Sequence, residues 1–304
     1  MSDRPWHRSL IKTGARLFLG SARAHFQDAF PGLRIVRATA SAEGAIRYRG
    51  TRVGTLSSAD VLRSRTGDSL YIIGSGPSIA QNDLSRLPPR SAILLNGAIS
   101  LADGPIAVPF AVAVEDERFI WRHFDLLKRT VREETPCLFS VEVLRAICEL
   151  EPGFLAERTI VLIDDIRKPY GSRRRRFDAI QSFDFVRRDA TSNAGLSFDP
   201  DRGLFRGGSV AISALQVALY CAPTTIGFFG IDISNADQPR FYETGGDSAA
   251  SGIAQAEARI VAHFVLAKTV AAERGIDLIN FSAVSALVSA GFGYDGRFSP
   301  SSPE

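Results

Sequence analysis

The feature that most constrains the fold begins at Ser69, where short unbroken apolar runs start to alternate with amphipathic helical segments. An apolar run without polar alternation is typical of a strand that is buried on both faces. Helices between such strands connect them in parallel and cover both sides of the sheet. The sequence therefore predicts an α/β fold with a Rossmann-like, mostly parallel sheet and helices on both faces. The predicted strands are Leu70–Ile73, Ala92–Leu95, Ile106–Val114, Cys137–Phe139, Ile160–Ile163, Thr225–Phe229 and Asp277–Asn280.

Segments outside this alternation suggest how the chain is divided. Residues 1–66 combine a basic helical segment with short strand-like runs, and we expect a small N-terminal α+β cap there. Residues 67–296 form the predicted main domain, which carries an irregular lid over about residues 165–207. Long irregular insertions at strand ends are usually lids or disordered loops. The Ser- and Pro-rich residues 297–304 are expected to form a flexible tail.

Residues 5–30 can be drawn as one amphipathic helix. At 100° per residue, its apolar and basic side chains lie on opposite sides. A helix of this kind either lies on a membrane surface or packs against its own domain, and the sequence leaves both interpretations open. The apolar side carries Trp6, Leu10, Ile11, Leu17 and Phe18, and the basic side carries Arg8, Lys12, Arg16 and Arg23.

Composition excludes several classes of protein. With 45% hydrophobic residues among 304, the chain is globular rather than disordered. No apolar run approaches the roughly 18 residues of a membrane-spanning helix, and the start of the chain does not resemble a secretory signal. Cys137, Cys148 and Cys221 lack metal-site spacing and are interpreted as buried thiols of a reducing compartment. We therefore expect a cytoplasmic protein, either soluble or peripheral on the inner membrane.

The basic residues are strongly biased toward arginine, with 32 Arg against 4 Lys and a net charge of only +3. Either a coding bias or anion recognition explains this, since the guanidinium binds carboxylate and phosphate through two parallel hydrogen bonds. The run Arg173–Arg176 has the same two interpretations, as a solvated loop or as a mobile arm over an anionic acceptor. We expect no nucleic-acid partner and leave homo-oligomerisation open.

A glycine-rich turn follows the first predicted strand of the main domain, with the sequence Gly74-Ser75-Gly76-Pro77-Ser78. Glycines let the backbone approach a phosphate, and the start of the next helix favours negative charge. The turn lacks the rest of a dinucleotide fingerprint, which needs a small residue at Ile79 and an acidic residue near Asn96. A nucleotide-binding turn that is not a nicotinamide or flavin site is therefore predicted.

Other polar residues end neighbouring strands and are expected at the same edge of the sheet. Asn96 offers both donors and an acceptor, which suits ribose or pyrimidine recognition. The turn before the helix at residue 209 is a second glycine-rich helix start that suits a phosphate. Each of these residues is also explained as an ordinary turn or helix cap. The predicted nucleotide-binding residues beyond the first turn are Asn96, Gly97, Glu115, Gly207, Gly208, Ser209 and Asp232.

The order and spacing of these motifs resemble a known group. The first glycine-rich turn, Asn96-Gly97, Gly208-Ser209 and Gly230-Ile231-Asp232 resemble the donor-binding parts of bacterial CMP-sialic acid-dependent sialyltransferases. With Asp116–Phe119, Ala214–Ala218 and Pro239–Tyr242, the pattern is more similar to lipopolysaccharide core Kdo transferases of the WaaZ type. The resemblance covers roughly residues 70–290.

The resemblance implies a glycosyltransferase that moves Kdo, an eight-carbon acidic sugar, or a related keto acid sugar from a CMP-sugar to a lipopolysaccharide-type glycan. It implies inversion, no metal and no cofactor besides the donor CMP-Kdo. The partners would be the CMP-activated sugar, an anionic lipid-linked glycan and the inner-membrane surface. The same glycine-proline-serine start is similar to pterin pyrophosphokinases and flagellin glycosyltransferases. A nucleotide-dependent transferase of that kind, or a non-catalytic binding protein, is the alternative.

The resemblance also suggests catalytic roles. Tyr242 would donate a hydrogen bond to the departing phosphate, as loop tyrosines do in the sialyltransferases. Those enzymes use a histidine base ahead of the long C-terminal helix, whereas His263 lies inside that helix and is interpreted as a core residue. The base is then Asp116 or Glu243, of which Asp116 is favoured because it follows a strand end. Asp164-Asp165 is interpreted as a strand-end or lid feature rather than a metal ligand.

Overall fold

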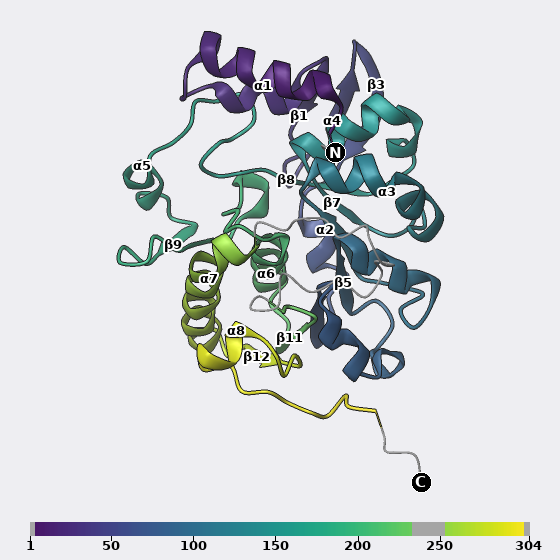
Figure 1. Cartoon of the computed structure of the whole chain (residues 1–304), viewed down its shortest axis with the longest axis vertical. Coiled ribbons are helices and arrows are strands. Elements are labelled where there is room, and N and C mark those ends of the chain that lie inside the picture. Colours follow the sequence, from purple (N-terminus) through teal and green to yellow (C-terminus); the bar gives the residue numbers. More distant parts are fainter. Residues whose placement is uncertain (1–3, 233–252, 301–304) are drawn as a thin grey trace.

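The computed structural model describes residues 4–232 and 253–300. Within these ranges a ten-stranded sheet runs through the molecule in the order β1-β2-β3-β8-β7-β6-β5-β4-β11-β12 (Figure 1). From β8 to β12 all neighbouring strands are parallel, which confirms the predicted α/β fold. These parallel strands are β4 (Ser69–Ile73), β5 (Ala92–Leu95), β6 (Ala111–Val114), β7 (Cys137–Ser140), β8 (Ile160–Ile163), β11 (Thr225–Phe229) and β12 (Asp277–Asn280).

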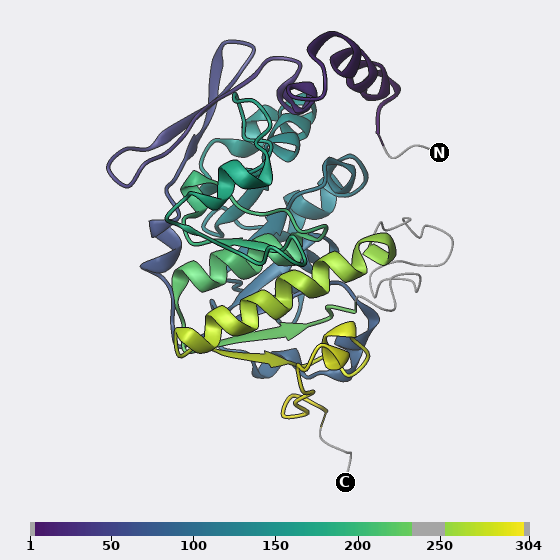
Figure 2. The same ribbon diagram turned by 90° about the vertical axis from the view of Figure 1, so that its left-hand side faces the viewer.

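Helices cover both faces of the sheet, and each face has its own hydrophobic core. In β4, Leu70 and Ile72 pack into one core, whereas Tyr71 and Ile73 pack into the other, as the alternation of side chains along a strand requires. The first core includes α6 and α7, and α7 lies across that face in Figure 2. The second core includes α3 and α4. The helices are α2 (Asp60–Arg63), α3 (Glu117–Thr130), α4 (Val141–Leu150), α6 (Val210–Cys221), α7 (Ile253–Glu273) and α8 (Ala286–Ser289).

The N-terminal strands extend the sheet beyond β8. β1 (Leu33–Val36), β2 (Gly44–Tyr48) and β3 (Thr51–Leu56) are antiparallel to one another, and β3 pairs in parallel with β8 at Leu56 and Ile160. The helical prediction for residues 5–30 was too long. The helix α1 (Trp6–Leu19) ends at Gly20, which has a φ of 66°, and a 3₁₀ helix follows over Ala24–Ala29. Glycine adopts this left-handed conformation readily and so allows the chain to turn there.

The segment predicted as a lid contains short elements around a small core of its own. These are α5 (Phe177–Gln181) and a hairpin of β9 (Val186–Arg188) and β10 (Gly195–Ser197). Ile166, Ile180, Phe185 and Phe205 form the core. The three cysteines are free and buried, as predicted.

In the part of the chain that the structure describes, no helix has the length and apolar character needed to cross a bilayer. The parallel strands bring several chain segments to one edge of the sheet, because their carboxyl ends all point the same way. Gly74 follows β4, Asn96 follows β5, Glu115 follows β6 and Gly230 follows β11. In parallel α/β sheets, ligands bind at this edge.

Candidate active site

A cavity of about 660 Å³ lies at this edge, and we call it the strand-end cavity. It brings together residues from the ends of two parallel strands, the start of α6 and the middle of α7. Six of the residues that the sequence singled out line it: Asn96, Glu115, Asp116, Gly207, Gly208 and Ser209. This cavity is large enough to enclose much of a nucleotide sugar, since small-molecule sites typically measure about 300–1,000 Å³.

Asn96 occupies the turn directly after β5. Its φ of 46° lies in the left-handed region, which asparagine tolerates better than most residues. Its side-chain Oδ1 is buried and accepts no hydrogen bond from any residue that the structure describes. Gly97 follows it in a buried 3₁₀ segment, and the Gly97 carbonyl accepts a hydrogen bond from Ser100 Oγ over 2.9 Å. Asn96 therefore serves the turn, and its buried Oδ1 is left unsatisfied next to the cavity that the residue lines.

Glu115 is buried at the end of β6, and one of its carboxylate oxygens is paired. Arg206 Nε donates to Glu115 Oε2 over 3.1 Å, while Arg206 Nη1 donates to Glu142 Oε1 over 2.6 Å. Burial acts to lower the pKa of Arg206, but the two carboxylates outweigh it and raise that pKa well above its usual value. Glu115 Oε1 has no hydrogen-bond partner among the described residues. A second unsatisfied acceptor thus lies next to the cavity, on a residue that lines it.

The glycines before α6 are required by the packing of α7. A Cβ on Gly207 would lie 3.0 Å from His263 Nδ1, and a Cβ on Gly208 would lie 2.9 Å from the Cβ of Ala256. Gly208 also has a φ of 104°, a backbone conformation that is strained for any residue with a side chain. Ser209 caps α6 by accepting a hydrogen bond from Ala211 N over 3.3 Å. The turn is therefore a tight helix start whose outer side opens onto the cavity.

The first glycine-rich turn is arranged differently from the prediction. Its N–H groups bind within the chain, where Gly74 N donates to Phe229 O and Gly76 N donates to Gly230 O. Ser78 donates to the Asp232 carboxylate twice, through its backbone N over 2.8 Å and its Oγ over 2.6 Å. The sequence predicted that this turn approaches a nucleotide, but the N–H groups of Gly74, Gly76 and Ser78 are already bonded to the end of β11 and the turn after it.

Close backbone approach explains the glycines of this turn. A Cβ on Gly74 would meet Ile231 Cδ1 at 2.9 Å, and one on Gly76 would collide with the Asp232 side chain. Ser75 and Pro77 are half-buried, and Pro77 starts a 3₁₀ helix that ends at Gln81. The described residues that line the strand-end cavity include neither residues 74–78 nor Asp232. Burial raises the pKa of Asp232, and the hydrogen bonds from Ser78 oppose that effect.

Asp116 lies at the cavity but its carboxylate is already hydrogen-bonded. It caps α3 by accepting from Arg118 N over 2.9 Å and also accepts from Arg118 Nε over 2.7 Å. Burial acts to raise the pKa of Asp116, but these hydrogen bonds and the charge of Arg118 hold it below the usual value. A carboxylate with a lowered pKa is a weak base.

His263 is buried in α7, as predicted, and it also lines the strand-end cavity. Its Nδ1 lies 2.7 Å from the Arg259 carbonyl oxygen. Because a carbonyl oxygen only accepts, this contact places the proton on Nδ1 and leaves the Nε2 lone pair unprotonated. Burial lowers the pKa of His263 below its usual value. The helical spacing of His263 beside Phe264 indicates burial, whereas its place at the cavity depends on the distant turn at Gly207, which packs against the ring.

Tyr242 and Glu243, with the Pro239–Tyr242 loop, lie outside the described residues. The buried Asp164 accepts from Tyr170 N over 3.0 Å and from the Arg37 guanidinium, which supports a structural role at the end of β8.

The described lining of the strand-end cavity is strongly cationic. Eight Arg and Lys side chains line it against four carboxyl groups. Arg167, Lys168 and Arg174 come from the predicted lid, whereas Arg259 comes from α7. Such a surface attracts a ligand with more than one negative charge.

The sequence of the chain matches a known protein family over most of its length. The family model for 3-deoxy-D-manno-octulosonic acid transferase WaaZ matches residues 55–290. The chain belongs to this family. It is therefore a glycosyltransferase of the kind that acts on lipopolysaccharide-type glycans, as the resemblance implied. Residues 1–54, which include α1, lie outside the match.

Solved structures of one sialyltransferase are also similar to the chain. Two are complexes of CstII from Campylobacter jejuni, with the substrate analogue CMP-3FNeuAc and with cytidine-5′-monophosphate. The first is 14% identical, covers 77% of this chain and 89% of its own, and has a TM-score of 0.41. The second is 15% identical, covers 77% and 86%, and has a TM-score of 0.33. None of the curated proteins matches the chain in sequence.

Proposed function

We propose that this member of the WaaZ family transfers Kdo, or a related keto acid sugar, from a CMP-activated donor to a lipopolysaccharide-type glycan. The observation that carries the proposal is a pair of buried, unsatisfied acceptors on two residues that line the strand-end cavity, Asn96 Oδ1 and Glu115 Oε1. Ribose hydroxyls and the exocyclic amine of cytosine are donors that would satisfy them. Leaving such acceptors unpaired costs about 1–3 kcal/mol each, so a ligand that pairs them gains affinity.

The charge of the cavity supports a CMP-linked acidic sugar. Such a donor carries one phosphate and one carboxylate. Arg167 and Arg259 line the cavity and offer guanidinium groups for these two anions. In this proposal the leaving phosphate is stabilised by arginine side chains and by the start of α6 at Ser209, and no step is assigned to a metal.

We propose His263 rather than Asp116 as the general base. His263 is neutral near pH 7, because burial lowers its pKa, and its Nε2 carries the lone pair. Asp116 is occupied by Arg118 and has a lowered pKa. In the transfer step, the acceptor oxygen bonds to the anomeric carbon while the bond from that carbon to the phosphate oxygen breaks. The bonding electron pair leaves with CMP, and the acceptor proton passes to His263 Nε2. Attack opposite the leaving group inverts the anomeric centre.

We also propose that α1 holds the protein on a membrane surface. Its apolar side faces outward, with Trp6, Leu17 and Phe18 exposed by 76%, 77% and 88%. A helix that packed on its own domain would bury this side instead. Clustered exposed apolar side chains of this size are typical of an interfacial helix. A lipid-linked acceptor would be reached from that surface.

A transfer assay tests the proposed function. The purified full chain is incubated with CMP-Kdo and a lipopolysaccharide core oligosaccharide, and CMP release is measured together with the mass of the oligosaccharide. The expected result is CMP release and a product heavier by one Kdo residue. The proposal fails if CMP-Kdo is not consumed. Stabilisation by ATP with Mg²⁺, with none by CMP, would instead identify a pyrophosphokinase-like enzyme.

A further inference from the structure

A second cavity, of about 740 Å³, lies between the N-terminal helix and the end of the sheet, and we call it the N-terminal chamber. One wall comes from α1 and the 3₁₀ segment after it, and the opposite wall comes from the chain that follows β8. Figure 2 shows α1 set apart from the sheet, at the end of the molecule away from β12. The α1 wall lies in residues 1–54, outside the family match, whereas the opposite wall lies within it.

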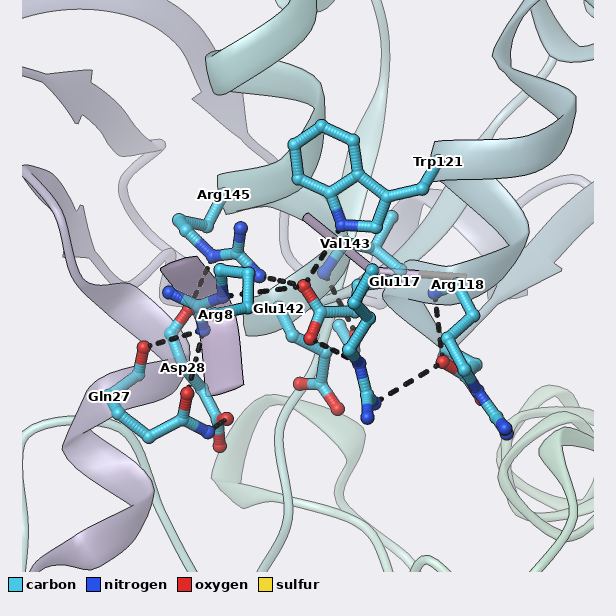
Figure 3. A network of polar contacts seen from close by, with 12 residues as sticks. Arg8, Gln27, Asp28, Glu117, Arg118, Trp121, Glu142, Val143 and Arg145 are labelled. Atoms are coloured by element: carbon cyan, nitrogen blue, oxygen red, sulfur yellow. Dashed lines mark hydrogen bonds and ion pairs between the residues drawn. The ribbon is translucent and has the colours of Figure 1, made fainter. Parts of the chain in front are cut away.

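A buried network of polar contacts holds the chamber together (Figure 3). Glu117, at the start of α3, accepts from the buried Arg145 guanidinium and from Trp121 Nε1 over 3.2 Å. Arg8 of α1 lies 3.7 Å from the same carboxylate and donates to the Gln27 carbonyl over 2.9 Å. Burial acts to raise the pKa of Glu117, but Arg145 and Arg8 hold it below the usual value. Charged groups therefore tie α1 to the main domain.

The chamber has more positive than negative side chains in its described lining. Seven Arg and Lys side chains line it against five carboxyl groups. Four of the cations, Lys12, Arg16, Lys168 and Arg174, make no side-chain hydrogen bond or ion pair with a described residue. Lys12 and Arg16 follow Arg8 at intervals of four residues, so one face of α1 points all three into the chamber. A cavity whose cations outnumber its carboxyl groups, and in which several cationic side chains lack a hydrogen bond or close ion pair with a described residue, is suited to an anionic ligand.

The chamber adjoins the strand-end cavity. Six residues line both: Arg4, Glu142, Asp165, Lys168, Arg174 and Arg206. A ligand in the chamber would therefore lie next to the proposed donor, with Arg206 and Glu142 between the two spaces. The apolar side of α1 faces away from the chamber, so a membrane bound to that side would lie close to the chamber wall.

We infer that the N-terminal chamber binds the anionic portion of the acceptor, a phosphate- or carboxylate-bearing saccharide, and directs its hydroxyl group toward the donor. This inference rests on the proposed function, because it takes the strand-end cavity as the donor site. It gives α1 two roles. Its outward side contacts the lipid surface, and its inward cations hold the charged glycan that projects from that surface.

Charge reversal on the inward face of α1 tests this inference. The double variant Lys12→Glu, Arg16→Glu is compared with Arg34→Glu, Arg47→Glu in calorimetric titrations with deacylated, phosphorylated core oligosaccharide in the absence of donor. Arg34 and Arg47 are exposed register partners in β1 and β2, so the control changes the net charge equally. The α1 variant should lose at least about tenfold in affinity, since two charge-assisted contacts are replaced by repulsion. The control should retain the wild-type affinity.

Titration with CMP separates this inference from the proposed function. For the α1 variant, the loss of oligosaccharide affinity should exceed the loss of CMP affinity by at least about tenfold. The double variant Lys12→Gln, Arg16→Gln should also lose more affinity for the oligosaccharide than for CMP, and its melting temperature should equal that of the wild type. Equal losses in the α1 variant and the β1–β2 control, or no oligosaccharide binding by the wild type, would overturn the inference. If the oligosaccharide binds through Lys12 and Arg16 but the protein does not use CMP-Kdo, the anion site in the chamber is supported and CMP-Kdo is ruled out as the donor.

Two further arms identify the anion. Dephosphorylated oligosaccharide binds more weakly than the parent if phosphate is the group recognised, and equally well if the sugar carboxylate is. Competition by inorganic phosphate at millimolar concentration would assign the site to phosphate alone.

Discussion

Arg206 Nε donates a hydrogen bond of 3.1 Å to Glu115 Oε2, and this pair connects the strand end of β6 to the turn before α6. The same guanidinium donates to Glu142, so one cation holds two largely buried carboxylates between the two cavities. Removing a charge from a buried network leaves its partners uncompensated, which costs more than the pair contributes. Arg206 is thus expected to be important for stability as well as for the site.

Replacing Arg206 with alanine should destabilise the protein by about 2–4 kcal/mol, because Glu115 and Glu142 lose their counterion. Equilibrium unfolding in urea measures this change. Arg202→Ala is the matched control, since Arg202 pairs with the exposed Asp184 over 3.1 Å and should change stability by less than about 1 kcal/mol. Similar losses in both variants would contradict the assignment.

The assignment of His263 as the general base predicts how the transfer rate depends on pH. Burial lowers the pKa of His263 below its usual 6.5, so transfer should be flat from pH 8 to about 7 and should begin to fall at a lower pH than an unperturbed imidazole would give. In more acidic solution the ring takes up a proton, and kcat/KM should then fall about tenfold per pH unit. His263→Ala should lower kcat by roughly 100-fold or more across the range. Asp116→Asn, which keeps a helix cap, should cost far less. A larger loss in Asp116→Asn would reverse the assignment.

Asp28 in the N-terminal chamber predicts a pH dependence of stability. Burial, followed by the charge of Glu142, raises its pKa from 3.8 to about 7. Between pH 3.8 and about 7, Asp28 is therefore protonated in the folded chain but has released its proton in the unfolded chain. This contribution to stability is complete below pH 3.8 and is lost as the pH rises through about 7. We compare the change in melting temperature that Asp28→Asn causes at two pH values. The change at pH 8 should be more stabilising than the change at pH 5 by roughly 3 °C. A uniform effect at both pH values would show that Asp28 is ionised throughout.

The outward side of α1 predicts membrane binding. Leu17→Glu, Phe18→Glu should reduce the fraction of protein that sediments with anionic vesicles by at least about tenfold, since each buried apolar side chain contributes roughly 1.5–3 kcal/mol. Val36→Glu is the control, because Val36 is also exposed but lies in β1, outside α1. If both variants bind vesicles like the wild type, α1 is not the membrane contact.

Sequence reasoning placed the polar strand ends correctly because parallel topology constrains them. Once the apolar runs were interpreted as parallel strands, Asn96 and Glu115 had to follow neighbouring strands at one edge. The structure gathers them with Gly207, Gly208 and Ser209 around one cavity. Their binding role stays a prediction, because the geometry alone does not name the ligand.

Other features depended on contacts between distant residues and were not accessible from local pattern. The glycines at residues 74 and 76 have the spacing of a phosphate turn, yet the turn after β11 fills that space with Asp232. The amphipathic pattern of α1 was clear, but its orientation was not. Glu117 attracts the basic side of α1 inward and so leaves the apolar side exposed, the reverse of ordinary helix packing. No periodicity in residues 5–30 indicates that partner.

The most direct test of the account is a calorimetric titration of the full chain and of Asn96→Gly with CMP. Glycine keeps the left-handed backbone at residue 96 and removes only the amide, so the fold should be unchanged. We predict that the wild type binds CMP and that Asn96→Gly binds it at least about fivefold more weakly with the same melting temperature. Absence of CMP binding by the wild type, or equal affinity in the two proteins, would contradict a CMP-sugar site in the strand-end cavity.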